Sequence, residues 1–193
     1  MKILARVPWQ FILLLLLISI WVVIMPRDAI PIQGKGGEWA TITNTTYDFS
    51  VNYPARWRAE IYGENGYRGL EEIKLQIYRS TLDQLFITVR YQKKVQPALE
   101  DVAAWRTRMI ASWNDVLRLD HEPVYEELTA SEGSMRGQPI IRRQYSNGVI
   151  HIEDVYLARA DDMIIISLSA DEARFEGYRD DFEGIVESFR PVE

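Results

Sequence analysis

The sequence has 193 residues, of which 47% are hydrophobic and 26% are charged, and its formal net charge is −6. This acidic balance excludes nucleic acid as an expected partner, because binding to phosphates needs clustered lysine and arginine. The chain contains no cysteine, which rules out disulfides, thiol nucleophiles and Cys-ligated zinc or iron–sulfur sites.

An uncharged hydrophobic run, WQFILLLLLISIWVVIM, occupies residues 9–25. Its length is at the lower end of the roughly 17–25 residues that a helix needs to cross a bilayer. Lys2 and Arg6 precede the run, so the positive-inside rule places residues 1–8 in the cytoplasm and the rest of the chain outside it. The sequence therefore predicts an uncleaved, single-pass signal anchor in the cell membrane.

A cleaved signal peptide is the alternative interpretation of this segment. Cleavage needs small residues close behind the apolar run, whereas the residues there are Pro26, Arg27 and Asp28. Gly34 and Gly36 have suitable spacing but lie about ten residues too far along the chain. The sequence context favours retention of the segment as a membrane anchor.

Residues 26–38 are predicted to be a linker, because they are rich in proline and glycine and lack hydrophobic periodicity. Residues 39–193 have the length of one ordinary domain. We therefore expect one extracytoplasmic domain tethered by the linker to the anchor.

Several segments of this domain have the alternating or continuous apolar pattern of strands. Residues 47–53 alternate strictly, Pro54 ends the run, and Trp57 is placed to fold back over its end. Asn147-Gly148 between two strand-like runs predicts a tight hairpin, and the apolar run 163–166 predicts burial on both faces. The remaining predicted strands cover residues 73–77, 85–91, 123–129, 140–145 and 149–157.

Two segments have helical periodicity. The first begins near Pro97. It has an apolar stripe that predicts a buried helix face, and Arg106 and Asn114 lie on other faces. The stripe consists of Leu99, Val102, Trp105, Met109, Trp113 and Val116. The second covers residues 173–189, with a stripe of Phe175, Tyr178, Phe182, Ile185 and Phe189. The expected fold class is α+β: a mainly antiparallel sheet with helices on both faces, an α/β/α sandwich, preceded by one N-terminal transmembrane helix.

Two motifs resemble those of the PsbP-like fold family. The segment YDFSVNYPARW at residues 47–57 is similar to the family's opening strand, and FEGIVESFRPV at residues 182–192 is similar to its closing helix. The family includes an extrinsic subunit of photosystem II, a Ran-binding nuclear import factor and many bacterial domains of unknown function. The resemblance implies an α/β/α sandwich that serves as an accessory or binding module without catalysis, and it assigns no site residues.

Few residues in the sequence could support chemistry. His121 and His151 are the only histidines, and no Gly-x-Ser-x-Gly motif accompanies them. His151 and Glu153 would share a strand face about 6.6 Å apart, and a third metal ligand could come from Asp120, His121 or Glu122. Polar residues on the solvated face of a strand are common, however, so we predict no catalytic, cofactor-binding or metal-binding residues and no cofactor.

The sequence thus favours a non-enzymatic, membrane-anchored domain that binds a protein partner outside the cytoplasm. One alternative is a small-ligand module with a cleft between the Trp105/Trp113 helix and the sheet. The other is a metal-dependent hydrolase that uses His151, which would require His121, His151 and Glu153 to converge.

Overall fold

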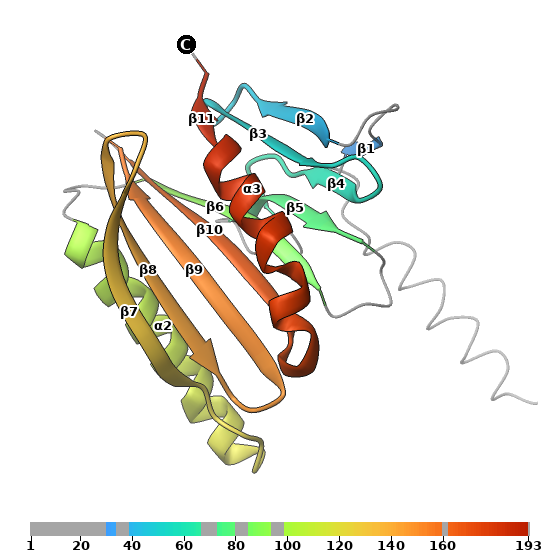
Figure 1. The fold of residues 1–193 in the computed structure, drawn as a ribbon. Helices are drawn as coiled ribbons and strands as arrows, with labels where there is room; N and C mark the ends of the chain where they lie inside the picture. Colours follow the sequence, from blue (N-terminus) through green and yellow to red (C-terminus); the bar gives the residue numbers. More distant parts are fainter. Residues whose placement is uncertain are drawn as a thin grey trace, which may run out of the picture.

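Two antiparallel sheets and two α-helices make up the described part of the computed structural model (Figure 1). The structure describes residues 30–33, 39–66, 73–79, 85–93, 99–159 and 162–192. The anchor predicted at residues 9–25 lies outside these ranges. Within them, no helix combines the length and the apolar character needed to span a bilayer.

The larger sheet has eight strands, and every pair of neighbours is antiparallel. Their spatial order is β1 (Ile30–Gln33), β4 (Arg58–Ile61), β5 (Ile73–Tyr78), β6 (Phe86–Lys93), β10 (Asp162–Asp171), β9 (Ile150–Ala158), β8 (Gln138–Ser146) and β7 (Glu126–Met135). The smaller sheet consists of β11 (Arg190–Pro191), β3 (Phe49–Pro54) and β2 (Trp39–Asn44). The mainly antiparallel α+β class is confirmed, but two sheets replace the single expected one.

Strand β1 corrects one detail of the sequence analysis. Residues 30–33 belong to the segment predicted to be a linker, yet they pair with β4 from Ile30–Ile61 to Gln33–Arg58. β1 is an edge strand, where Pro31 is tolerated because one side of the strand needs no backbone donor. The proline and glycine content of residues 26–38 led to the prediction of a linker, although residues 30–33 form a short strand.

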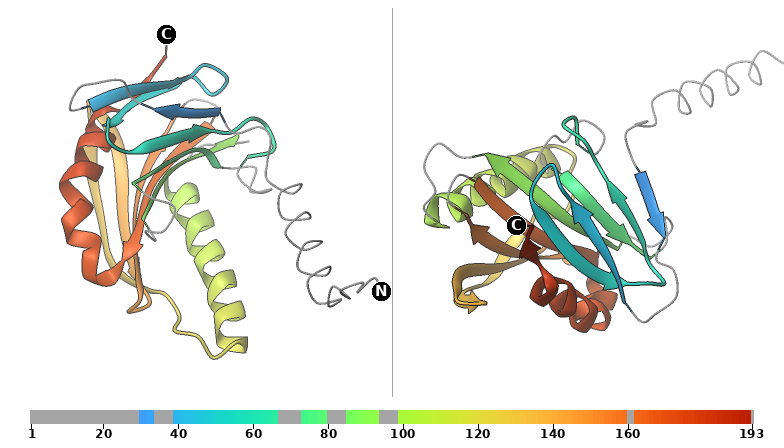
Figure 2. Two further views of the ribbon diagram at one scale, coloured as in Figure 1. Left: turned by 90° about the vertical axis from the view of Figure 1, so that its right-hand side faces the viewer. Right: turned by 90° about the horizontal axis from the view of Figure 1, so that it is seen from above.

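The helices lie on opposite faces of the larger sheet, as the left view of Figure 2 shows. α2 (Leu99–Leu119) packs on one face against β8 and β9. The other face is covered by the 3-10 helix η1 (Glu172–Tyr178), by α3 (Arg179–Ser188) and by the smaller sheet, with α3 packed against β3.

The main hydrophobic core lies on the α3 face. Phe182 and Ile185 of α3 are fully buried there, as the periodicity of the second predicted helix indicated. Trp57 folds back after β3, where its backbone N–H donates to the Pro54 carbonyl at 2.8 Å and its ring meets Tyr178 edge-on. These contacts confirm that both motifs of the family resemblance meet in one core.

The apolar run of β10 is buried on both faces, as expected. Ile164 and Ile166 belong to the main core, whereas Met163 and Ile165 belong to a separate cluster with Ile141 and Tyr156. Side chains alternate between the two faces of a strand, so two hydrophobic environments explain an uninterrupted apolar run.

The predicted hairpin joins β8 to β9. Gly148 has a positive φ of 79°, and the Asn147 side chain accepts hydrogen bonds from the backbone N–H groups of Val149 and Ile150. The preceding hairpin joins β7 to β8, and its turn falls at Arg136 and Gly137, both with positive φ.

The buried face of α2 also differs from the predicted stripe. Val116 is 57% exposed, whereas Arg106 and Asn114 are buried on either side of Ile110. These three residues are spaced four apart and form one helix face. The prediction that Arg106 and Asn114 face away from the core was wrong, because Arg106 pairs with the buried Asp154 and Asn114 pairs with the backbone of Tyr125, just before β7.

Candidate functional site

A row of polar side chains crosses the α2 face of the larger sheet. Cross-strand pairing places Gln76 opposite Thr88, Thr88 opposite Ser167, Ser167 opposite Asp154, and Asp154 opposite Arg143. Paired residues in a sheet share one face, so the five form a continuous row from β5 to β8. All except the half-buried Arg143 are buried. This face of the sheet is therefore polar at its centre, unlike the apolar α3 face.

The side chain of Arg106, on α2, contacts Asp154 of this row. Its Nε donates to Asp154 Oδ2 at 2.6 Å and its Nη2 to Asp154 Oδ1 at 3.3 Å. The Tyr156 hydroxyl donates to the same carboxylate at 3.1 Å. Burial lowers the pKa of the Arg106 guanidinium, but attraction to Asp154 and the hydrogen bond to it outweigh burial, so the pKa lies above its ordinary value. The Arg106 guanidinium is therefore held in its charged form.

Asn114 fixes the far half of α2 to the start of β7. Its side chain donates to the carbonyl of Tyr125 and accepts from the N–H of Tyr125, both at 2.7 Å. The Tyr125 ring lies 6.5 Å from that of Trp113, and the Arg106 guanidinium carbon lies 5.0 Å from the Trp113 ring centroid. These contacts bring an aromatic pair beside the buried arginine.

A cleft of about 280 Å³ lies between α2 and the sheet. Its walls contain three residues of the polar row, Gln76, Thr88 and Ser167, together with two arginines and three aromatic rings. The lining residues are Ile73, Gln76, Phe86, Thr88, Arg90, Arg106, Trp113, Tyr125, Ile152, Ser167 and Ser169. The position matches the cleft considered for the small-ligand alternative, which was placed beside the Trp113 helix, but its floor is polar.

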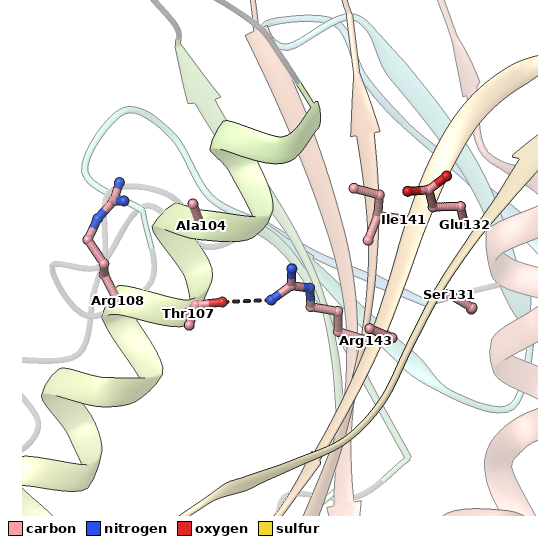
Figure 3. Close-up of a pocket in the computed structure, with 8 residues that line it drawn as sticks. Ala104, Thr107, Arg108, Ser131, Glu132, Ile141 and Arg143 are labelled. Carbon is pink, nitrogen blue, oxygen red and sulfur yellow. Dashed lines mark hydrogen bonds between the residues drawn. The ribbon is translucent and has the colours of Figure 1, made fainter.

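A second, more open groove of about 640 Å³ lies between α2 and the β7–β8 hairpin (Figure 3). Ala104, Thr107 and Arg108 line it from the helix. Arg143 crosses the groove, where its Nη1 donates to Thr107 Oγ1 at 2.7 Å and to Glu127 Oε2 at 3.1 Å. The groove opens beside β7, the last strand of the sheet.

The residues considered for a metal site do not come together. His151 Nδ1 lies 3.2 Å from Glu172 Oε1, and the His151 ring stacks on Phe175 with centroids 3.7 Å apart. Glu153 instead accepts hydrogen bonds from Arg142 and Gln144.

The other candidate ligands, Asp120, His121 and Glu122, are exposed at the end of α2. In the described ranges, no three His, Cys, Asp or Glu side chains are placed to hold a metal ion. The metal site considered from the sequence is therefore not formed by these residues.

Three residues were not predicted from the sequence: Arg106 and Ser167, which line the cleft, and Asp154, which pairs with Arg106. Asp154 and Ser167 lie within strand-like runs, and each interrupts the apolar residues on one face. A polar residue within a strand that is otherwise buried is the signal that could have identified them, because such a group needs a partner.

No family model and no curated protein matches the sequence. Solved structures do match it. The solution structure of cyanobacterial PsbP (CyanoP) from Synechocystis sp. PCC 6803 superposes with a TM-score of 0.63 over 83% of this chain and 97% of that one, at 16% identity.

Two further structures are less similar. A protein from Bacteroides thetaiotaomicron gives a TM-score of 0.50 at 14% identity, over 84% of this chain and 50% of that chain. LpqN of Mycobacterium tuberculosis is described as involved in cell envelope biogenesis. It gives a TM-score of 0.45 at 12% identity, over 86% of this chain and 91% of that chain.

An antiparallel α+β domain with its helices on opposite faces of the sheet is the class that these observations define. Within that class, the chain has the PsbP-like fold. The resemblance stated from residues 47–57 and 182–192 is thereby confirmed at the level of the fold.

Proposed function

We propose that this chain is a non-enzymatic accessory domain, anchored by residues 9–25 at the outer face of a membrane, that binds a protein partner. The PsbP-like fold supports an accessory or binding role, because that is the role the family resemblance implies. The uncharged run that follows Lys2 and Arg6 supports the anchor and its orientation.

The observation that carries the proposal is the exposed edge strand β7. Nine of its ten residues are exposed, and among the described strands β8 is its only neighbour in the sheet. The pairing register skips Leu128 at a bulge, and this side chain is 51% exposed. Extended peptides bind proteins by adding a strand to such an edge, with main-chain hydrogen bonds for affinity and adjoining pockets for specificity.

The groove beside β7 would receive side chains of the added strand. Ala130 and Ser131 are small and line it together with Glu132. Positive charge comes from Arg108 on α2 and from Arg143 on β8, which is paired with Ala130. The partner segment proposed is therefore an extended strand with polar side chains of mixed charge that point toward α2.

Site-specific photo-crosslinking in intact membranes tests this proposal. A photoreactive residue at Leu128 should crosslink to a defined protein, whereas one at Val149 should not. Val149 is a matched control, because it is equally apolar, 54% exposed and located on the β8–β9 connection. Equal adducts from both positions, or none from Leu128, would contradict binding at β7.

The second candidate function is a small-ligand module. The cleft beneath α2 favours it, because a concave site with aromatic walls and a few convergent polar groups is typical of small-molecule binding.

A further inference from the structure

Two deeply buried hydrogen-bonding groups face the cleft beneath α2 without a partner among the described residues. They are Arg106 Nη1 and Ser167 Oγ, on side chains that are 1% and 3% exposed. Buried polar groups in folded proteins are almost always paired, and each unpaired one is costly. An acceptor that entered the cleft could provide a partner for such a group.

The charges of the lining residues indicate whether the acceptor is an anion or a cation. The eleven described lining residues include two arginines, Arg90 and Arg106, and no aspartate or glutamate. Asp154 lies beside Arg106 and engages its Nε and Nη2, which leaves Nη1 for a further acceptor. A cation would find no carboxylate in this lining, whereas an anion would meet guanidinium and hydroxyl donors.

Aromatic residues of the cleft indicate which other groups the ligand carries. Phe86, Trp113 and Tyr125 line the cleft, and the rings of Trp113 and Tyr125 are tilted by 55°. Such rings pack against apolar or aromatic groups. The volume of about 280 Å³ is slightly below the usual range for ligand pockets, so a ligand would have to be small.

We propose that this cleft binds a small organic acid. Its carboxylate accepts hydrogen bonds from Arg106 Nη1 and Ser167 Oγ, and its apolar or aromatic body packs against Trp113 and Tyr125. Because Asn114 fixes Tyr125 to the helix, the aromatic wall is preorganised. The proposal rests on the small-ligand candidate function and adds the class of ligand to it.

Titration of the purified full-length protein with four probes tests the proposal. Benzoate carries both features, benzamide lacks the charge, benzylamine reverses it, and inorganic phosphate lacks the ring. The readout is the indole N–H signal of Trp113 in a nitrogen–proton correlation spectrum, assigned by its loss in Trp113→Phe. Benzoate should shift this signal saturably, and the other three probes should bind at least tenfold more weakly.

Ser167→Ala should raise the Kd for benzoate about tenfold, since it removes one hydrogen bond to a charged group. Ser134→Ala on the exposed end of β7 is the matched control and should leave the Kd unchanged. An unchanged melting temperature of Ser167→Ala without ligand would establish that the loss is local.

The outcomes separate the two levels of the proposal. If benzamide binds as tightly as benzoate, the cleft binds small molecules but the carboxylate assignment is wrong. If phosphate binds as tightly, the aromatic wall contributes nothing and the organic class is wrong. If no probe shifts the Trp113 signal, or if Ser167→Ala binds benzoate normally, the binding site itself is overturned.

Discussion

Arg106 and Asp154 form an ion pair in which both side chains are buried, with a separation of 2.6 Å between Nε and Oδ2. It joins the middle of α2 to the central part of the sheet, in a position where a hydrophobic contact would be expected. Moving two charges out of water is costly, and attraction between them offsets that cost only when the geometry is good. The pair consequently fixes where α2 sits rather than simply adding stability.

Arg106→Ala should lower the free energy of unfolding by about 3–5 kcal/mol, because Asp154 would be left buried and unpaired. The double variant Arg106→Met with Asp154→Leu should recover most of that loss, since it removes both charges and fills the space. Urea denaturation followed by circular dichroism measures both. Arg108→Ala on the exposed side of the same helix should change stability by less than about 0.5 kcal/mol. An Arg106→Ala cost as small as that would show that the pair contributes little.

Phe182→Ala should cost about 3–5 kcal/mol, because the ring is fully buried between α3 and the main core. The neighbouring exposed position Glu187 supplies the control, and Glu187→Ala should be nearly neutral. Chemical denaturation of the purified protein gives both values. A loss below about 1 kcal/mol for Phe182→Ala would be incompatible with the packing of α3 described above.

Glu172 should contribute to the acid dependence of stability. A hydrogen bond from Ser146 lowers the pKa of this carboxyl, burial raises it, and the hydrogen bond and charge of His151 lower it further, so the pKa lies below 4.5. A lowered folded-state pKa stabilises the fold above the unfolded value and loses that contribution as pH falls through the folded value. The effect is small, because the side chain is 41% exposed.

The measurement is the pH dependence of unfolding below pH 4.5. Wild type should lose more stability on acidification than Glu172→Gln does, while Glu187→Gln should follow wild type. If wild type and Glu172→Gln lost the same stability between neutral and acidic pH, the contact among Ser146, His151 and Glu172 would not contribute to the acid dependence of stability.

The N-terminal segment should remain attached and should place the domain outside the cytoplasm. Protease added to intact cells, or to spheroplasts where an outer wall intervenes, should digest residues 39–193. Mass spectrometry of the membrane-extracted protein should recover residues 1–25. A mature N-terminus near residue 37 would contradict the uncleaved anchor, and a domain protected until lysis would contradict the orientation.

Periodicity predicted the C-terminal half of the core well, because Phe175, Phe182 and Ile185 pack against hydrophobic partners and obey a helical repeat. It failed for α2, where Arg106 and Asn114 are buried by specific polar contacts. Arg106 finds its partner on β9, 48 residues away in the sequence, and no local pattern contains that information. The strands β1 and β4 were missed because they have only four residues each. β2 was missed although it has six residues and pairs with the next strand, β3.

The candidate cleft was predictable in position but not in chemistry. Trp113 indicated that the helix could form one wall of a cleft. The floor arises from register, since Gln76, Thr88 and Ser167 become neighbours only when β5, β6 and β10 align. Each of these residues in isolation is an ordinary polar residue in a strand.

The last strand of the chain has a consequence for the order of assembly. β11 pairs with β3 through Pro191 and Phe49, and α3 covers the same strand, so the C-terminal segment completes a layer begun near the N-terminus. Contacts of such large sequence separation form late, because the loop between them must close first. The apolar face of β3 consequently stays uncovered until α3 and β11 have been synthesised. Folding of the domain therefore finishes only after these C-terminal elements are available.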